Sequence, residues 1–334
     1  MALSTTYNVA GNREDLTDFL TILEPEDTPK LSSFNKTKRP SNVYQEWQMD
    51  SLLPVKISGV VEGQDVQSFT NKASTRARTG NYVQTFRRDW MVSRLQEASD
   101  TAGVASEVAN AKTKAMREIK RDIESAIGSD NDEQLDNGTV PYLSRGLGKW
   151  INATAQTTNA VPTAFLTPAA QICTTATGSM TEANFNAVFQ SIFTQVGGRR
   201  NYTLYAGPNL KGSISNFQRQ TSTATQYAFH VTQDASEHQI DLTVDIYVGD
   251  FHHVRIVPDL FNGLVDNAAP TTTTAQQLAR GYAIDPELVG VGYMIGLESN
   301  ELPDQGGGRR GYVMAALTLM VKNPKGLGKF SATS

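Results

Sequence analysis

The stretch AGVASEVANAKTKAMREIKRDIESAI, residues 102–127, has the clearest pattern in this 334-residue chain. Apolar residues recur in it at steps of three and four: Val104, Val108, Ala111, Ala115, Ile119, Ile123 and Ile127. Because charged residues take most of the other positions, the spacing predicts one amphipathic helix. Gly128 is placed to end it. At about 1.5 Å per residue, the helix would be a rod of about 37 Å.

Downstream, a second helix is predicted over 182–196. Thr181 offers an N-cap, Glu182 suits the first turn, and Gly197 follows the last turn. Its apolar stripe, which we interpret as core-facing, consists of Phe185, Val188, Phe189, Ile192, Phe193 and Val196. A shorter helix is predicted over 208–217, after a proline near its start.

The C-terminal half also contains runs typical of strands. These runs are 202–206, 244–248, 251–257, 288–295 and 312–321. Gly249-Asp250 predicts a hairpin turn between the second and third runs. Mixed helices and strands of this kind indicate an α+β fold.

Before the long helix, residues 44–61 and 81–92 show partial alternation of apolar and polar residues, with a polar stretch, 62–80, between them. We expect a long two-stranded excursion. An isolated hairpin cannot bury enough surface to be stable in water. Another subunit is therefore expected to cover it.

Charge is distributed unevenly along the chain. The net charge is −4 over residues 1–35 and +5 over residues 36–94, in a chain whose total is −4. An acidic leader and a basic segment would match each other between neighbouring copies, although solvated faces without a partner also explain the pattern. The candidate intersubunit contacts are Trp47, Trp90, Arg76, Arg78, Arg87 and Arg88. The two tryptophans are interpreted either as intersubunit anchors or as local core.

Composition excludes several classes of protein. The chain is 39% hydrophobic and 19% charged, which indicates a folded protein. Its weak net charge argues against sequence-specific nucleic-acid recognition. The acidic leader is not a signal peptide, and no run approaches the about 20 apolar residues of a membrane span. A single cysteine, Cys173, excludes an intrachain disulfide framework.

Motifs that carry chemistry are missing from the sequence. It has no Gly-x-Ser-x-Gly, no His-Glu-x-x-His and no phosphate-binding Gly-x-x-x-x-Gly-Lys-Ser/Thr. The adjacent His252 and His253 would face opposite sides of a strand and cannot readily share a metal ion. Residues 130–134 resemble the start of a calcium loop, but Leu135 stands where the glycine belongs. We predict no enzymatic activity, no cofactor and no metal.

The order of these segments, together with local motifs, resembles the major capsid (major head) proteins of tailed bacteriophages, which share the Hong Kong phage (Johnson) capsid fold. The motifs are REDLTD (13–18) with EDTP (26–29), EWQMDSL (46–52), EIKRDIE (118–124), VDIYVGDF (244–251), IVP (256–258) and DPE (285–287).

This resemblance implies an organisation for the whole chain. The implied parts are an N-terminal arm (1–44), an extended loop (45–92), a peripheral domain (93–179 and 301–334) with a spine helix at 102–127, and an axial domain (180–300). The implied function is a major capsid protein that self-assembles into the icosahedral head shell around double-stranded DNA. Expected partners are other copies in hexamers and pentamers, a portal, a separate scaffolding protein or none, decoration proteins, and DNA through weak non-specific contact.

The implied location is the virion, after assembly in the host bacterial cytoplasm. No motif around Lys56 or Lys72 supports a covalent crosslink, so we expect non-covalent assembly. Two alternatives stay open at this point: an encapsulin-like compartment shell, and a cytosolic enzyme with an unrecognised site.

Overall fold

The computed structural model describes residues 22, 26–99, 101–219, 233–234, 239–240, 244–262 and 278–331. The remaining residues of the expected N-terminal arm, 1–21 and 23–25, lie outside this part. The helices are α1 (Pro29–Ser33), α2 (Arg94–Ala98), α3 (Glu107–Ile127), α4 (Leu147–Trp150), α5 (Glu182–Val196) and α6 (Pro208–Ser215). The 3-10 turns are η2 (Thr163–Phe165), η3 (Ala169–Gln171), η4 (Thr177–Ser179), η5 (Asn216–Arg219) and η6 (Pro324–Gly326).

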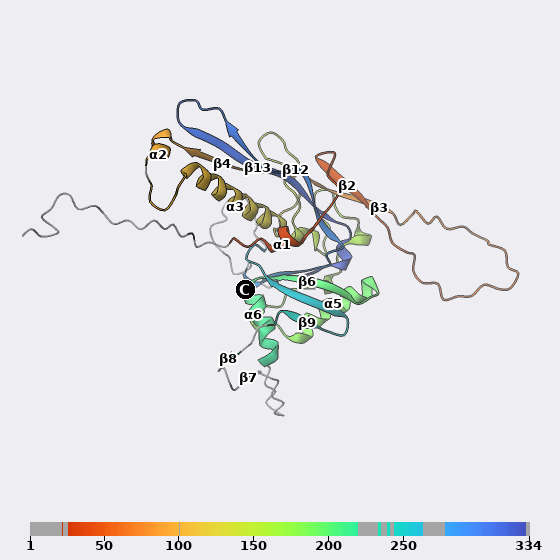
Figure 1. Ribbon diagram of the computed structural model, residues 1–334. Coiled ribbons are helices and arrows are strands. Elements are labelled where there is room, and N and C mark those ends of the chain that lie inside the picture. The colour runs from red at the N-terminus through yellow and green to blue at the C-terminus, as the bar shows by residue number, and fades with distance from the viewer. Residues whose placement is uncertain are drawn as a thin grey trace, which may run out of the picture.

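One four-stranded sheet carries α3 on one of its faces (Figure 1). Its order is β1 (Asn35–Lys36), β12 (Val289–Leu302), β13 (Arg309–Val321) and β4 (Gln84–Val92). Apolar side chains of α3 such as Ile119 and Ile123 join those of β13 in one core cluster. The spacing of these isoleucines along the helix places them on its sheet-facing side.

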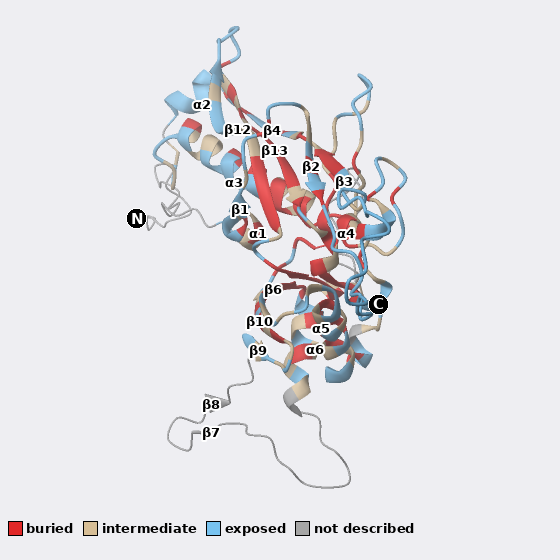
Figure 2. Ribbon diagram, turned by 90° about the vertical axis from the view of Figure 1, so that its right-hand side faces the viewer, coloured by how far each residue is buried: buried red, intermediate tan, exposed pale blue. Residues whose placement is uncertain are grey.

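A six-stranded sheet and α5 form the second layer pair, seen in the lower part of Figure 2. The order is β5 (Ile172–Cys173), β14 (Gly328–Ser331), β11 (Arg280–Ile284), β6 (Arg200–Ala206), β10 (His252–Pro258) and β9 (Ile246–Val248). Phe185 and Phe189 of α5 are buried in its core cluster. Two short ribbons, β2 (Tyr44–Met49) with β3 (Ala77–Tyr82) and β7 (Gln233–Asp234) with β8 (Gln239–Ile240), complete the described strands.

Both long helices confirm their predictions, with one shifted boundary. α3 begins at Glu107 rather than near residue 102, because the Ser106 hydroxyl accepts a hydrogen bond from the Ala109 N–H and caps the helix there. Gly103 precedes it with φ +79°, a conformation that ordinary helix does not allow. α5 runs from its Thr181 cap to Gly197, where φ is +74°.

The expected excursion differs in its strand pairing. β2 pairs antiparallel with β3, from Tyr44↔Tyr82 to Met49↔Ala77. Most of the expected second strand, 81–92, is instead β4, which pairs with β13. The reason is burial, because α3 and the sheet enclose Phe86 and Trp90 of β4, which a free hairpin would leave in water.

Sheet membership also departs from the expected division of the chain. β12, mostly within the 180–300 segment, lies in the four-stranded sheet because it pairs with β13 from Val289↔Val321 onward. β14, within the 301–334 segment, lies in the six-stranded sheet because it pairs with β11. The chain therefore crosses between the two layer pairs more often than its linear order suggests.

Candidate assembly site

Residues 50–76, which we call the extended loop, leave the body of the molecule between β2 and β3 (Figure 1). They form turns and irregular structure, and nearly all are exposed. Large apolar side chains are among them: Leu52 (97% exposed), Ile57 (95%), Val55 (91%) and Phe69 (90%), with Leu53, Val60, Val61 and Val66. Exposed apolar side chains gathered on one segment in this way indicate an interaction site.

Polar contacts close the base of the extended loop. The Thr75 hydroxyl donates to Asp50 (2.6 Å), and the Arg76 guanidinium lies 3.5 Å from the same carboxylate. The hydrogen bond from Thr75 lowers the pKa of Asp50. Arg78 pairs across the ribbon with Glu46 at 3.1 Å. Arg76 and Arg78 thus hold the two ends of the loop together within the chain.

The other candidate contacts lie in β2 and β4. Trp47 and Trp90 are 8% and 7% exposed and belong to the core, which favours the local-core interpretation. Trp47 lies against Trp150 (ring centroids 5.6 Å apart), and Lys112 covers the Trp90 ring. Arg88 of β4 donates two hydrogen bonds to Asp122 of α3, at 2.6 and 2.8 Å.

Arg87 is exposed, and strand alternation places it on the opposite face of β4 from Arg88. A role of any of the six residues in contacts between subunits stays a prediction. Of the six, Arg87 is the one that no described contact explains.

Three clusters of charged residues lie near the C-terminal end of α3. In the first, the Lys30 ammonium contacts Asp259, Glu124 (3.4 Å) and the Asn262 side-chain oxygen (3.0 Å). All four side chains are buried. Glu124 also accepts hydrogen bonds from the backbone N–H groups of Lys30 and Leu31, each at 2.8 Å. Burial raises the pKa of Glu124.

The second cluster joins the six-stranded sheet to the residues after α3. Asp130 contacts both Arg280 and Lys329, the latter at 3.0 Å. The Tyr282 hydroxyl donates to the Gly128 carbonyl at the end of α3 (3.0 Å), and burial raises the pKa of Tyr282. Burial lowers the pKa of Lys329.

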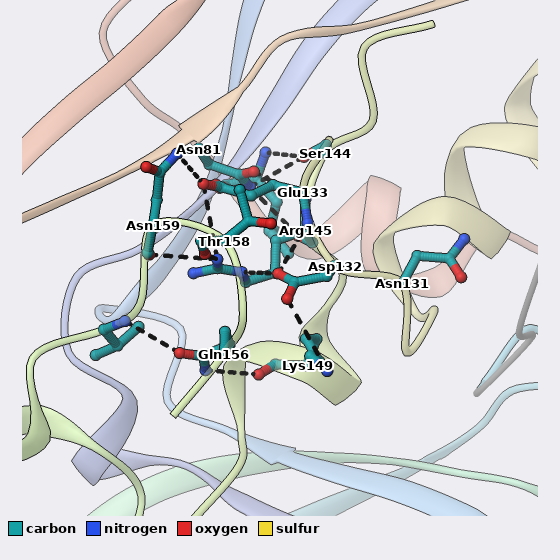
Figure 3. A network of polar contacts seen from close by, with 12 residues as sticks. Asn81, Asn131, Asp132, Glu133, Ser144, Arg145, Lys149, Gln156, Thr158 and Asn159 are labelled. Atoms are coloured by element: carbon teal, nitrogen blue, oxygen red, sulfur yellow. Dashed lines mark hydrogen bonds and ion pairs between the residues drawn. The ribbon is translucent and has the colours of Figure 1, made fainter. Parts of the chain in front are cut away.

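The third cluster centres on Arg145, which is fully buried (Figure 3). Its guanidinium donates to Asp132 (2.7 Å) and to the Thr158 carbonyl (2.5 Å) and lies 3.7 Å from Glu133. Burial raises the pKa of Glu133 to about 7, although Arg145 and the hydrogen bond from Asn159 act to lower it. Residues 130–134, whose sequence resembles the start of a calcium loop, form a loop after α3 instead, and Asp132 and Glu133 face Arg145.

Asn81 of β3 connects this third cluster to the four-stranded sheet. Its side-chain amide donates to Ser144 (3.0 Å) and to the Leu319 carbonyl of β13 (2.8 Å), and its oxygen accepts from the Arg145 N–H (2.8 Å). The strand that carries the extended loop is therefore fixed to the body. No local pattern predicts Asn81, Arg145 or Lys30, because their partners come from distant parts of the chain.

Little in the described part of the chain suggests catalysis or metal binding. In that part, no group of three or more His, Cys, Asp or Glu side chains is arranged to hold a metal ion. His252 stacks on Phe189, with ring centroids 4.1 Å apart, and burial lowers its pKa to about 4, so it is a neutral core residue. His230 and His238 lie outside the described residues. None of the described helices is both long and apolar enough to cross a membrane.

Solved phage structures share this architecture. A chain in the asymmetric unit of the bacteriophage PhiM1 mature capsid matches with a TM-score of 0.63 at 12% identity, over 99% of this chain and 97% of that chain. A Mycobacterium phage Bobi chain matches with a TM-score of 0.60 at 11% identity, over 100% of both chains. A Gordonia phage Cozz chain matches with a TM-score of 0.59 at 13% identity, over 99% of this chain and 96% of that chain.

At these identities the solved structures show a shared fold, which confirms the Hong Kong phage-type architecture. No curated protein sequence matches the chain. A family model described as the SU10 major capsid protein matches residues 3–334, nearly the whole sequence. The chain belongs to the SU10 major capsid protein family and is a major capsid protein of a tailed phage.

Proposed function

We propose that copies of this chain assemble into hexamers and pentamers of an icosahedral head shell, and that the extended loop of each copy lies over the next copy. The exposed apolar side chains of the extended loop support this proposal. Burying one such side chain contributes about 1.5–3 kcal/mol. In a shell, a neighbouring copy of the chain is available to bury these side chains.

The fixed base of the loop favours this use. β3 is held by Asn81, and Asp50 closes the loop with Thr75 and Arg76. A segment whose ends are already ordered loses less conformational entropy when it binds. The loop leaves one end of the molecule, whereas α2 lies at the other (Figure 1). Contacts between unlike surfaces of neighbouring copies close into rings when the rotation between copies permits.

The proposed contents and partners follow from the same assignment. The shell encloses double-stranded DNA, and its weak net charge suits non-specific contact with phosphate and counterions. Proposed protein partners are a portal, a separate scaffolding protein or none, and decoration proteins. Assembly would take place in the cytoplasm of the bacterial host.

Replacing residues 53–73 by a short Gly-Ser linker tests the role of the loop. This change is preferable to deleting 62–80, because such a deletion would remove part of β3. We expect subunits with an unchanged urea-unfolding midpoint that form no closed shells in negative-stain microscopy. Normal shells from the linker variant would contradict the proposal.

Two loop variants of natural length test whether assembly needs the apolar side chains of the loop. The triple variant Leu52→Ser, Ile57→Ser, Phe69→Ser removes exposed apolar surface. The matched control Ser58→Ala, Gln64→Ala, Gln67→Ala alters polar positions of the same loop. Shells should be lost from the first variant and retained in the second.

A further inference from the structure

The side chain of His252 lies where α5 meets the hairpin formed by β9 and β10. His252 is the first residue of β10 and is 1% exposed. Its imidazole stacks on Phe189 of α5, with ring centroids 4.1 Å apart, and lies nearly parallel to Tyr247 of β9 at 5.5 Å. Phe185 of α5 meets it edge-on at 6.1 Å. The imidazole is therefore part of the contact that holds α5 against this edge of the six-stranded sheet.

Both nitrogens of this imidazole lack a hydrogen-bond partner in the part of the chain that the structure describes. The turn between β9 and β10 explains why. A Cβ added to Gly249 would lie 2.6 Å from the imidazole Cε1 and 2.9 Å from Nε2, so the Gly249 backbone covers this edge of the ring. A neutral imidazole tolerates such surroundings far better than an imidazolium ion, which would lose its water without gaining an acceptor.

Charged groups near the ring do not compensate for this burial. Among the described residues, Asp250 favours the charged form of His252 and Arg199 opposes it, and both of these side chains are exposed to water. Burial is the largest effect, and it lowers the pKa of His252 to about 4.

The other titratable side chains on the neighbouring elements are engaged elsewhere or stay neutral. The Tyr247 hydroxyl donates to Glu182 of α5 at 2.5 Å, and Arg200 of β6 pairs with Asp285 at 2.8 Å. Burial raises the pKa of Tyr202 of β6 to about 12. A proton on His252 would therefore have no buried counter-ion in the closed contact.

We propose that His252 makes the contact between α5 and the β9–β10 hairpin sensitive to acid, so that its protonation separates these elements while α3 and the four-stranded sheet stay packed. Separation gives the imidazolium ion access to water, which it lacks in the closed contact. The α3 layer responds in the opposite sense, because Glu133 binds its proton more tightly in the folded chain. The proposal concerns the single subunit and does not rest on shell assembly.

Proton binding sets the direction and the size of the effect. The ordinary pKa of histidine, 6.5, applies to the open form, and the value of about 4 applies to the closed form. The closed contact is therefore most stable above pH 6.5 and weakens as the pH falls from 6.5 toward 4. Between pH 7 and pH 5, these two values give a rise of about 20-fold in the equilibrium constant for opening.

Hydrogen exchange in dissociated full-length subunits tests the proposal. Exchange rates at pH 7 and pH 5 are divided into the intrinsic rates at the same pH, which gives protection factors for peptides from α5, β10 and α3. We expect protection of α5 and β10 to fall about 20-fold at pH 5 and to recover at pH 7, while α3 keeps its protection. An equal fall in all three elements, or no fall in α5 and β10, would overturn the proposal.

Substitutions assign the effect to one imidazole. His252→Phe keeps a ring against Phe189 but binds no proton, so protection of α5 and β10 should be the same at both pH values. His252→Leu serves the same purpose if the larger ring disturbs the packing. The matched control is His253→Leu, because strand alternation places His253 on the opposite face of β10, and it should keep the natural response. An acid response that persists in both His252 variants would exclude His252 as its cause.

Discussion

Lys30 is a fully buried cation, and other residues balance its charge only in the folded chain. Its ammonium faces Asp259, Glu124 and the Asn262 oxygen, and all of these side chains are buried. Removing one member of such a cluster leaves the opposite charges without a partner, which costs more than the cluster itself contributes. Stability should therefore be sensitive to this residue.

Lys30→Met tests that sensitivity. The variant leaves Glu124 and Asp259 buried without their cation, so we expect the free energy of unfolding to fall by about 3–5 kcal/mol. Urea denaturation of dissociated subunits measures it. The matched control is Lys38→Met, at an exposed position, which should change stability by less than about 0.5 kcal/mol. Equal losses in both variants would contradict this account.

Glu133 predicts a dependence of stability on pH. Its carboxyl has an ordinary pKa of 4.5, which burial raises to about 7 in the folded chain. Between these values the folded state binds the proton more tightly than the unfolded state. The contribution of Glu133 is therefore fully present below pH 4.5 and is lost as the pH rises to 7, by up to about 3 kcal/mol.

Glu133→Gln removes this titration. The variant should be more stable than the natural chain above pH 7, while the difference shrinks toward pH 4.5. Urea midpoints across this range measure the difference, with the exposed Glu118→Gln as control. Parallel pH profiles for the natural chain and the Glu133→Gln variant would show that Glu133 does not titrate in this window.

At the scale of elements, the C-terminal end of α3 packs closely against the residues after β10. A Cβ added to Gly128 would lie 2.2 Å from the Phe261 carbonyl oxygen and 2.9 Å from the Lys30 ammonium nitrogen. The obstacle is backbone, which cannot rotate away. Gly128 therefore sets how closely α3 approaches the residues after β10.

Two glycine substitutions should have opposite effects. Gly128→Ala forces these elements apart and should cost about 1–3 kcal/mol or more. Gly212→Ala, inside α6 with nothing within 4 Å of the added Cβ, should stabilise by about 0.5–1 kcal/mol. Thermal unfolding of both variants measures the changes. If Gly128→Ala left the stability unchanged, the contact between the end of α3 and the residues after β10 would be able to relax around the added methyl group.

Strands were harder to predict than helices, and β4 shows the reason. Its alternation is visible in the sequence, yet alternation alone does not reveal the partner of a strand. The expected partner was residues 44–61, whereas the actual partner is β13, more than 200 residues later. The choice depends on which pairing lets α3 cover Phe86 and Trp90.

For the whole molecule, the two sheets are tied together near the end of α3, and the extended loop lies outside both cores (Figure 1). Folding of the subunit and assembly of the shell should therefore be separable. Concentration should shift assembly by mass action without changing the fold of the released subunit.

Assembly should leave the chain covalently unchanged. Lys56 and Lys72 are exposed in the extended loop. Intact-mass measurement of shells dissociated in denaturant should give the mass of a single chain. A ladder of multimers would refute this prediction.

The sequence by itself determined α3 apart from its first residues, α5 and the family resemblance. Caps and periodicity act over about four residues, so short-range patterns suffice for helices, as Thr181 and Gly197 show. Tertiary structure alone decided the pairing of β4 and the charged clusters. Lys30 lies 94 residues from Glu124 and 229 from Asp259, and Asn81 lies 238 residues from Leu319. The attraction between two such groups becomes strong only when folding has removed water from both of them. No spacing along the sequence indicates which distant residues will meet in this way.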